Sequence, residues 1–434
     1  MTTTIKNAWL VDIDPPRARR GALRVADGII VDVGKDVRNE PGDEVLDCRG
    51  AVVLPGLVNG HVHLCSALAL GMPPAEGRPE NFRQLLEQTA WRFDAALDLP
   101  AVEAGVQLGA VEALRCGTTT VFDHHSSPNC AAGALDAVEG ALERLGLRGV
   151  LCFEISDRNG PDTRQAGVAE TERYLDKCQR RHDGRFAGLV GAHALFTLED
   201  ETLNELRDLA RSFEIGVHLH LAEDAYDEEV CSAEHQLYPL DRLRAHGLLQ
   251  PGMVFAHGTH LSDEDVAALA DVRAAVVHNP RSNMKSGVGY GFPHRLIGRA
   301  PLLLGSDAML SDLLAEVQAA WLKARDERVD LRPEHAAAML AGSARRAAEL
   351  LQVPLGRLES QHAADLVVTD YVPATPLADE NAAAHLVLGV GARHVTDVMI
   401  AGKWRLRERR VQGLDETAVR KAAAQAAADL RQRM

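Results

Sequence analysis

Eight apolar, strand-like runs alternate with helical stretches along the middle of this 434-residue chain. The strand-like runs are residues 52–58, 119–122, 149–155, 189–192, 215–219, 253–256, 274–277 and 302–305. Apolar spacing typical of helices occurs between them, at residues 101–115, 131–145, 199–212 and 262–270. Eight strands that alternate with helices predict an α/β protein built on a (β/α)8 TIM barrel.

The link after the seventh run is the weakest part of this pattern. Residues 285–299 contain too many glycines for a good helix. Helical spacing returns after the eighth run, at residues 312–328 and 333–351. We therefore expect an irregular connection between the last two barrel strands.

Both ends of the chain have a different texture, with short Val- and Ile-rich pieces broken by glycine and aspartate. These pieces could form two domains, but pairing them into one small β-sandwich is the more economical interpretation. We expect the β-sandwich to combine residues 1–55 and 358–412, on either side of a barrel over 56–357. An Ala-rich helical segment at 413–434 completes the chain.

Composition excludes several classes of partner. The formal net charge is -15 and the pI is near 5.6, which disfavours nucleic acid and anionic membrane surfaces. No apolar run approaches the roughly 20 residues of a membrane span, and the first residues lack the features of a signal peptide. The seven cysteines show no Cys-x-x-Cys spacing. This usage favours the cytoplasm and argues against disulfides or a structural zinc knuckle.

Histidines gather at the ends of the expected strands. The stretch from Pro55 to His63 places His61 and His63 on the same side of the first strand end. Any single histidine of this kind is as often an ordinary core or surface residue. Nine of the eighteen histidines nevertheless fall at strand ends: His61, His63, His124, His125, His193, His218, His220, His257 and His278. In a barrel these ends form the active-site face, so the set indicates a functional site.

This set suits a hydrolytic metal site. Three neutral imidazoles and one carboxylate can hold Zn²⁺ and leave a position open for water. The ion lowers the pKa of that water toward about 7, and a nearby carboxylate can then move protons. The eighth run leads into Ser306 and Asp307, and Glu223 lies three residues after His220. Since no lysine ends the fourth strand, where a carbamylated lysine bridges two metals in some barrels, we expect one metal ion.

The motifs resemble the amidohydrolase superfamily, in its cytosine/guanine/triazine deaminase branch. They occur in the family's order and span most of the chain: Pro-Gly-Leu-Val-Asn-Gly-His-Val-His, His-Leu-Ala-Glu, Ala-His-Gly, His-Asn-Pro-Arg-Ser-Asn-Met and Leu-Gly-Ser-Asp. At a finer level the chain is similar to the SsnA group of aminohydrolases, through segments that include residues 122–126, 152–159 and 278–290. The resemblance implies a barrel of the metal-dependent hydrolase type.

The resemblance also implies roles for individual residues. His61, His63, His220 and Asp307 match the metal ligands, with Zn²⁺ the favoured ion and Fe²⁺ the alternative. Glu223 matches the acid/base, His257 matches the histidine that hydrogen-bonds the attacking water, and Asp307 would also accept that water's proton. His218 is expected to pack inside the barrel. The expected wall of the substrate pocket is His124, His125, Arg158, His193, His278, Ser282 and Asn283.

These matches predict a hydrolase of carbon–nitrogen bonds, other than peptide bonds, in cyclic amidines. It would release ammonia from a purine- or pterin-like heterocycle. The alternatives are a cyclic amide hydrolase or chlorohydrolase that uses the same site and, more remotely, a non-catalytic scaffold. The resemblance also implies a homodimer or larger homo-oligomer.

Leu195 occupies a position where related deaminases usually have proline, and the arginine-bearing motif of guanine deaminases is not found. Guanine is therefore disfavoured as the substrate.

Residues 64–97, which include Trp91, are expected to overhang the site as a lid; the alternative is a simple surface insertion.

Overall fold

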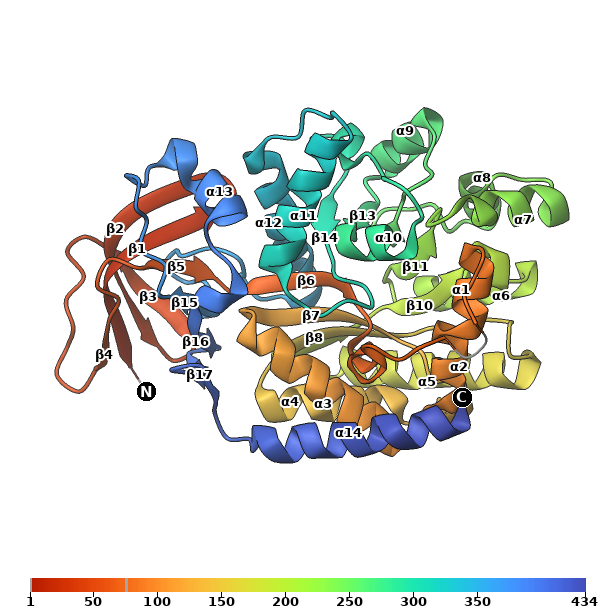
Figure 1. Ribbon diagram of the computed structural model, residues 1–434, viewed down its shortest axis with the longest axis horizontal. Helices are drawn as coiled ribbons and strands as arrows, with labels where there is room; N and C mark the ends of the chain where they lie inside the picture. Colours follow the sequence, from red (N-terminus) through yellow and green to blue (C-terminus); the bar gives the residue numbers. More distant parts are fainter. Residues whose placement is uncertain (1, 75–76) are drawn as a thin grey trace.

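The computed structural model describes residues 2–74 and 77–434, which form a barrel and a smaller β domain beside it (Figure 1). The barrel has two parallel sheets. One contains β6 (Leu57–Val62), β7 (Thr118–His125), β8 (Arg148–Phe153) and β9 (Phe186–Gly188). The other contains β10 (Val190–Ala194), β11 (Val217–Leu221), β12 (Val254–His257), β13 (Ala275–His278) and β14 (Leu302–Leu304).

Two isolated β-bridges close these sheets into a ring. Ile155 pairs with Ala192, and Val62 pairs with Asp307, which joins the last strand position to the first. The fourth strand position is divided at Leu189, so that β9 pairs with β8 and β10 pairs with β11. The predicted (β/α)8 barrel is therefore confirmed.

The first predicted strand, residues 52–58, was wrong as a single element. The chain divides at Gly56 into β5 (Val52–Pro55), which belongs to the small domain, and β6, which begins the barrel. Gly56 donates a backbone hydrogen bond to Asp365, and a Cβ added at Gly56 would lie 2.3 Å from Thr119 Oγ1. The apolar run continues through this division because residues on both sides of it are buried.

Helices cover the outside of the barrel. The link between β13 and β14 contains two short elements, α10 (Pro280–Ser286) and the 3-10 helix η4 (Pro293–Leu296). The chain between and after them is irregular, as the glycines of this region led us to expect. The other barrel helices are α3 (Leu99–Arg115), α4 (Ala134–Leu145), α5 (Pro161–Gln179), α6 (Asp200–Ser212), α7 (Ala225–His235), α8 (Pro239–Ala245), α9 (Asp263–Val272), α11 (Leu313–Asp326) and α12 (Pro333–Leu351).

The strand period explains how the barrel separates its core from its site. Phe122 and Cys152 lie in one buried cluster with Ala347 and Leu351 of α12. Side chains two residues apart on a strand share a face. The residues two positions after Phe122 and Cys152 are His124 and Glu154, which lie at or just past the carboxyl ends of β7 and β8.

Both ends of the chain contribute to one nine-stranded sheet, in which β15 (Leu366–Thr369) pairs antiparallel with β5. Its other strands are β1 (Thr3–Ile13), β2 (Pro16–Ala26), β3 (Ile29–Gly34), β4 (Glu44–Asp47), β16 (Val395–Ile400), β17 (Lys403–Arg407) and β18 (Arg410–Val411). The expected β domain built from both ends of the chain is confirmed, and its nine strands form one continuous sheet. The sequence did not predict α13 (Asp379–Leu388), which lies between β15 and β16.

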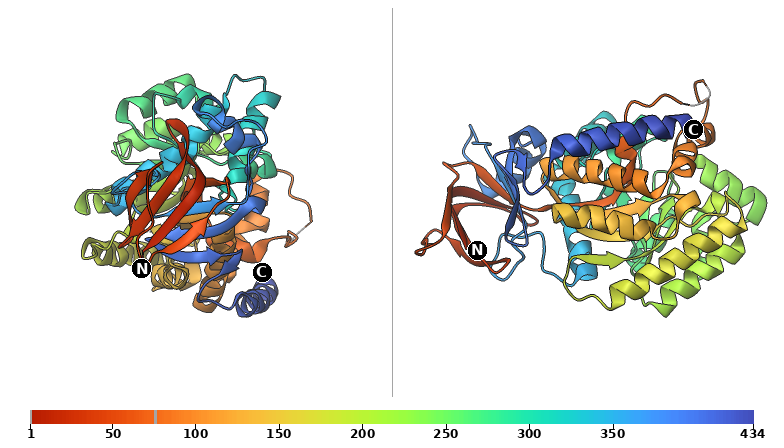
Figure 2. Two further views of the ribbon diagram at one scale, coloured as in Figure 1. Left: turned by 90° about the vertical axis from the view of Figure 1, so that its left-hand side faces the viewer. Right: turned by 90° about the horizontal axis from the view of Figure 1, so that it is seen from below.

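The last helix, α14 (Glu416–Arg433), leaves the small domain and packs along α3 of the barrel (Figure 2). Within the described ranges, no helix has both the length and the apolar character needed to cross a membrane. The seven cysteines, all inside those ranges, are unpaired thiols.

Candidate active site

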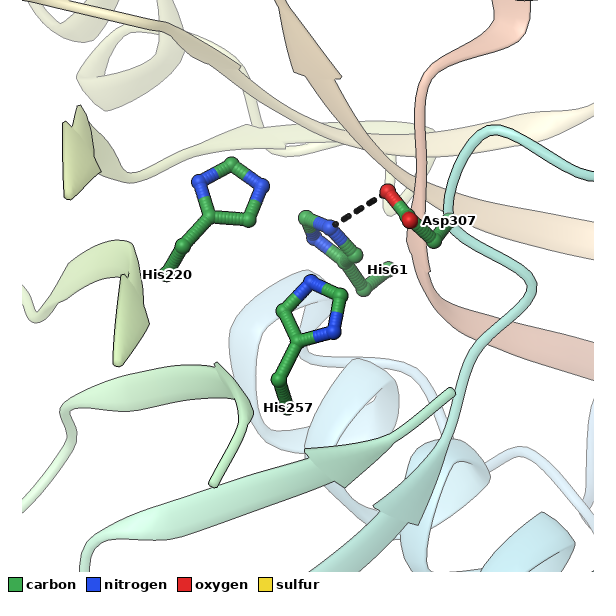
Figure 3. Close-up of side chains that lie close together, drawn as sticks. All are labelled: His61, His220, His257 and Asp307. Carbon is green, nitrogen blue, oxygen red and sulfur yellow. Dashed lines mark ion pairs between the residues drawn. The ribbon is translucent and has the colours of Figure 1, made fainter. Parts of the chain in front are cut away.

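The carboxyl ends of the barrel strands bring three imidazoles and a carboxylate together (Figure 3). Ligand-type atoms of these four residues all lie within 4.8 Å of one another: His61, His220, His257 and Asp307. His257 and Asp307 have φ angles of 75° and 53°, a left-handed backbone that residues other than glycine rarely adopt. Strain of this kind is concentrated at functional sites.

His63 lies beside this cluster. Its Nε2 atom is 3.2 Å from Asp307 Oδ1 and 3.3 Å from His220 Nε2. His61 Nε2 is 3.4 Å from the same oxygen of Asp307. The four residues that the sequence indicated as metal ligands therefore lie together, with His257 as a fifth member of the group.

Hydrogen bonds with neighbouring groups orient His220, His257 and Asp307. His220 Nδ1 donates to the carbonyl of His193 at 3.0 Å, which leaves His220 Nε2 with a lone pair. His257 Nδ1 bonds Asn283 Oδ1 at 2.8 Å, and Asp307 accepts a short hydrogen bond from Ser282. Such contacts fix the tautomer and orientation of a metal-binding imidazole.

His218 supports His61. The distance between His61 Nδ1 and His218 Nε2 is 3.0 Å, and both rings are buried. His218 was expected to pack inside the barrel, and the residue is buried as expected. It also gives His61 a hydrogen-bonding partner on the side away from Asp307.

Burial and the Asp307 charge set the protonation of the cluster. Burial lowers the pKa of His61 to about 3, which keeps the ring neutral. Burial opposes a charge on His63 as well, but the Asp307 carboxylate outweighs it and raises the pKa of His63 to about 9. For Asp307 burial opposes the charged form, but the neighbouring imidazoles of His61 and His63 outweigh it and hold the pKa of Asp307 well below the usual range. An ion bound here would replace the His63 proton.

The donor set fits a divalent metal ion. His61 Nε2 and His257 Nε2 are buried and have no hydrogen-bond partner of ordinary geometry in the described part of the chain. Unpartnered buried nitrogens of this kind are costly unless something binds them. Imidazole nitrogens and carboxylate oxygens are the common ligands of zinc.

Glu223 follows β11 and faces the same space. Its Oε2 atom is 3.6 Å from His257 Nε2. Burial raises the pKa of Glu223 to about 7, and the neighbouring His257 only partly offsets this. A carboxyl group near half protonation at neutral pH can accept a proton and return it.

A cavity of about 320 Å³ opens over this cluster. Its far side is formed by the segment after β6: η1 (Leu64–Ala69), α1 (Phe82–Gln88) and α2 (Ala90–Ala96), with Trp91 among the lining residues. The segment thus overhangs the site, although the predicted lid also includes residues 75–76, which lie outside the described residues. Its opening and closing stay a prediction.

The expected pocket wall is only partly at the cavity surface. His124, His125, His193 and Ser282 line the cavity. The other three lie behind that surface. Arg158 binds acidic residues, Asn283 binds His257, and His278 packs 6.1 Å from the Tyr290 ring.

Two carboxylates at the cavity, Glu154 and Asp94, were not predicted from the sequence. Arg158 lies 2.8 Å from Glu154 and 3.1 Å from Asp94, and both carboxylates line the cavity. Glu154 carried a usable signal, because it lies two residues after Cys152, on the face of β8 that turns into the barrel. Asp94 carried none, since it lies in the segment that the barrel pattern does not describe.

The fold and the site define a class: a (β/α)8 barrel hydrolase with a histidine- and aspartate-rich metal site at the carboxyl ends of its strands. Residues 52–405 match the Amidohydrolase family. The chain belongs to that family.

Individual relatives cover nearly the whole chain. A 5'-deoxyadenosine deaminase from Methanobrevibacter smithii is 27% identical, over 99% of this chain and 98% of that protein. A 5-methylthioadenosine/S-adenosylhomocysteine deaminase from Moorella thermoacetica is 29% identical, over 95% of both. A zinc-bound adenosine deaminase structure from Xanthomonas campestris superposes with a TM-score of 0.86 at 26% identity, over 99% of this chain and 98% of that one.

Proposed function

We propose that this chain is a metal-dependent aminohydrolase that releases ammonia from a purine ring, most simply the 6-amino group of an adenine nucleoside. The observation that carries the proposal is the grouping of His61, His63, His220 and Asp307 beside Glu223, a buried carboxyl with a pKa raised to about 7 by burial. Hydrolysis of an amidine needs this combination of a metal site and a proton-transfer group.

We assign one ion to His61, His63, His220 and Asp307, with Zn²⁺ favoured and Fe²⁺ as the alternative. Their nitrogen and oxygen atoms lie 3.2 to 3.4 Å apart, between His63 and Asp307, His63 and His220, and His61 and Asp307. A divalent ion in such a site lowers the pKa of a coordinated water toward about 7 and so supplies hydroxide at neutral pH.

The chain's own residues then handle protons. Glu223 is placed to accept one proton of the attacking water and give it to the ring nitrogen, and Asp307 is placed to accept the second, from the hydroxyl that has added to the ring carbon. His257 Nε2, 3.6 Å from Glu223, hydrogen-bonds the oxygen that adds to the ring carbon. Collapse of the tetrahedral adduct breaks the carbon–nitrogen bond as this second proton passes to the amino group, which leaves as ammonia.

The relatives and the cavity support an adenine nucleoside. The relatives' names specify 5'-deoxyadenosine, 5-methylthioadenosine and S-adenosylhomocysteine. The cavity of about 320 Å³ lies at the small end of the range for ligand pockets, which suits a purine better than a large substrate. Trp91 and Phe93 offer apolar faces for the ring.

At the finer level we propose membership of the SsnA group, on the segments around Phe122, Cys152 and His278. His124, Glu154 and Arg158 of these segments lie at or directly behind the cavity. A cytoplasmic location and assembly into a homo-oligomer stay predictions of the same resemblance.

The test is ammonia release by zinc-loaded protein against a panel of adenine nucleosides, purine bases, pterins, cyclic amides and chlorotriazines. We expect turnover with adenine nucleosides. Release of chloride or ring opening without ammonia would instead assign one of the alternative hydrolase activities. No turnover with any compound, in protein that binds metal, would contradict the proposed substrate class.

A further inference from the structure

We propose that Asp227 is a positioning residue, which holds the acid/base group Glu223 in place through the backbone of Ala222. The inference rests on the proposed function, because it takes Glu223 as the group that moves protons. Asp227 lies in the first turn of α7, on the helix that follows Glu223. Among the described residues, those that line the cavity do not include Asp227, so its effect on the reaction must pass through another group.

The backbone is strained directly before Glu223. Ala222 has a φ angle of 47°, in the left-handed region that residues with a Cβ rarely adopt. Such a conformation persists only where the surrounding structure holds it. Ala222 is the first residue after β11, so its φ angle sets the direction in which the chain leaves the strand and the direction in which Glu223 points.

Three hydrogen bonds hold this turn. The carbonyl oxygen of Leu221 accepts from the backbone N–H of Gly258 at 2.9 Å. The carbonyl oxygen of Ala222 accepts from the backbone N–H of His260, also at 2.9 Å. The N–H of Ala222 itself donates to Asp227 Oδ2 at 2.9 Å. The first two bonds join backbone groups, so the Asp227 side chain is the member of this set that a substitution can remove.

Asp227 is a buried carboxylate that binds Ala222 with only one of its two oxygens. The residue is 2% exposed, and burial raises the pKa of Asp227 to about 6, which the hydrogen bond from Ala222 partly offsets. The group is therefore mostly ionised at neutral pH, and its charge strengthens the bond to Ala222. Oδ1 is buried and has no hydrogen-bond partner of ordinary geometry in the described ranges. Because an unpartnered buried oxygen costs stability, packing of α7 alone does not explain a carboxylate here, whereas the contact with Ala222 does.

The position of Glu223 depends on this turn. Glu223 lines the cavity, and its Oε2 atom lies 3.6 Å from His257 Nε2. A return of Ala222 to a negative φ angle would turn the chain after it and carry the Glu223 side chain away from this place. A misplacement of about 1 Å can lower a catalytic rate by about 10²-fold. Loss of the Asp227 carboxylate should therefore lower kcat, although substrate and metal still bind.

Steady-state kinetics of full-length, zinc-loaded variants test the inference on the nucleoside that the wild-type protein converts best. We expect Asp227→Ala to lower kcat roughly 10- to 100-fold, with little change in KM and unchanged metal content. Asp227→Asn should recover most of the rate, because its amide oxygen can still accept from Ala222. Cys231→Ala is the matched control. Cys231 is buried one turn further along α7, so its loss weakens packing of the same helix and removes no bond to Ala222. Its kcat should be unchanged.

Crystal structures of the wild-type and Asp227→Ala proteins give a readout that needs no turnover. We expect Ala222 to lose its positive φ angle in the variant and Glu223 to move away from His257. If both residues keep their places, the inference is overturned, whether or not the protein releases ammonia.

The kinetic outcomes separate this inference from the proposed function. Equal losses of kcat in Asp227→Ala and Cys231→Ala would overturn the positioning role, because the stability of α7 would then explain both. An Asp227→Asn protein as slow as Asp227→Ala would also overturn it and assign the effect to the charge of Asp227. In either case a wild-type protein that releases ammonia keeps the proposed function. If the wild-type protein has no turnover but the turn moves in Asp227→Ala, Asp227 still positions Glu223 and only the proposed function fails.

Discussion

Burial decides what the acids and imidazoles of this site can do. The same loss of water that keeps His61 neutral, with a pKa lowered to about 3, raises the pKa of Glu223 to about 7. One group thereby keeps a lone pair for a metal ion, and the other can exchange a proton near neutral pH. Two residue types thus acquire complementary roles within one cluster.

Replacing Glu223 by glutamine should abolish proton transfer and leave the ligands in place. We expect kcat to fall roughly 10²- to 10⁴-fold, which is the usual contribution of an acid/base group. Metal content measured on the same sample should be unchanged. Near-normal turnover would refute the role of Glu223.

The pH dependence follows from the raised pKa of Glu223. The carboxyl must be ionised to accept a proton from water, so kcat/KM should fall as the pH drops through its pKa. That pKa is raised to about 7 by burial, and the charge of a bound ion would move it lower. The acid limb should therefore lie between about pH 5 and about pH 7. A flat profile from about pH 5 to about pH 8 would contradict this account.

His218→Phe should weaken metal binding through His61. The substitution keeps a buried ring but removes the nitrogen 3.0 Å from His61 Nδ1. Loss of such a supporting contact typically costs 10- to 100-fold in metal affinity, which chelator competition measures. His278→Phe is the control, since His278 is also buried at a strand end. Within the described residues, its side chain makes no hydrogen bond to any of the proposed ligands. Equal affinities for both variants would count against the role of His218.

At the scale of elements, α3 approaches η1 closely just after the His61–His63 pair. A Cβ added at Gly109 would lie 2.6 Å from the backbone oxygen of Leu64, so η1 or α3 would have to shift. The chain that carries the metal ligands continues directly into this contact. The packing of α3 therefore helps to hold His63 in place.

Gly109→Ala should consequently destabilise the protein and weaken metal binding together. Gly140→Ala in α4 is the matched control, because its added Cβ meets nothing within 4 Å. Alanine is favoured over glycine in a helix by roughly 0.5–1 kcal/mol, so this control should be slightly stabilised. Urea unfolding and metal titration of both variants give the comparison. A Gly109→Ala protein as stable as the control would show that η1 does not depend on this contact.

The sequence predicted most elements because strand and helix periods are local properties. Histidines at strand ends could be grouped because parallel strands of a barrel end on one face. The division of the first predicted strand at Gly56 could not be predicted, since buried apolar residues continue across it. The position of Asp94 could not be predicted either, because only the tertiary packing of α2 brings that carboxylate to Arg158. Glu154 could have been found by extending the inward face of β8 by one step.

At the scale of the whole molecule, a buried ion pair connects the barrel to the small domain. Arg148 of β8 donates two hydrogen bonds to Asp365, at 2.8 and 3.1 Å, and both side chains are buried. Asp365 also accepts from the backbone of Ala401 in the small domain. Loss of one partner would leave a buried charge unpaired.

Asp365→Ala should therefore lower the free energy of unfolding by about 3–5 kcal/mol. Asp370→Ala is the control, because its pair with Arg409 is exposed and should contribute no more than about 1 kcal/mol. Urea unfolding measures both. Equal losses in the two variants would mean that the Arg148–Asp365 pair does not stabilise the junction.

The central claim is that this barrel end uses a metal ion to remove ammonia from an adenine nucleoside. The most direct test is ammonia release from 5'-deoxyadenosine by chelator-stripped protein before and after zinc is restored, with His61→Ala beside it. We expect no release from stripped protein, recovery on reloading, and no recovery in the variant. Full activity in stripped protein, or reloaded protein that releases no ammonia from any adenine nucleoside, would contradict the account.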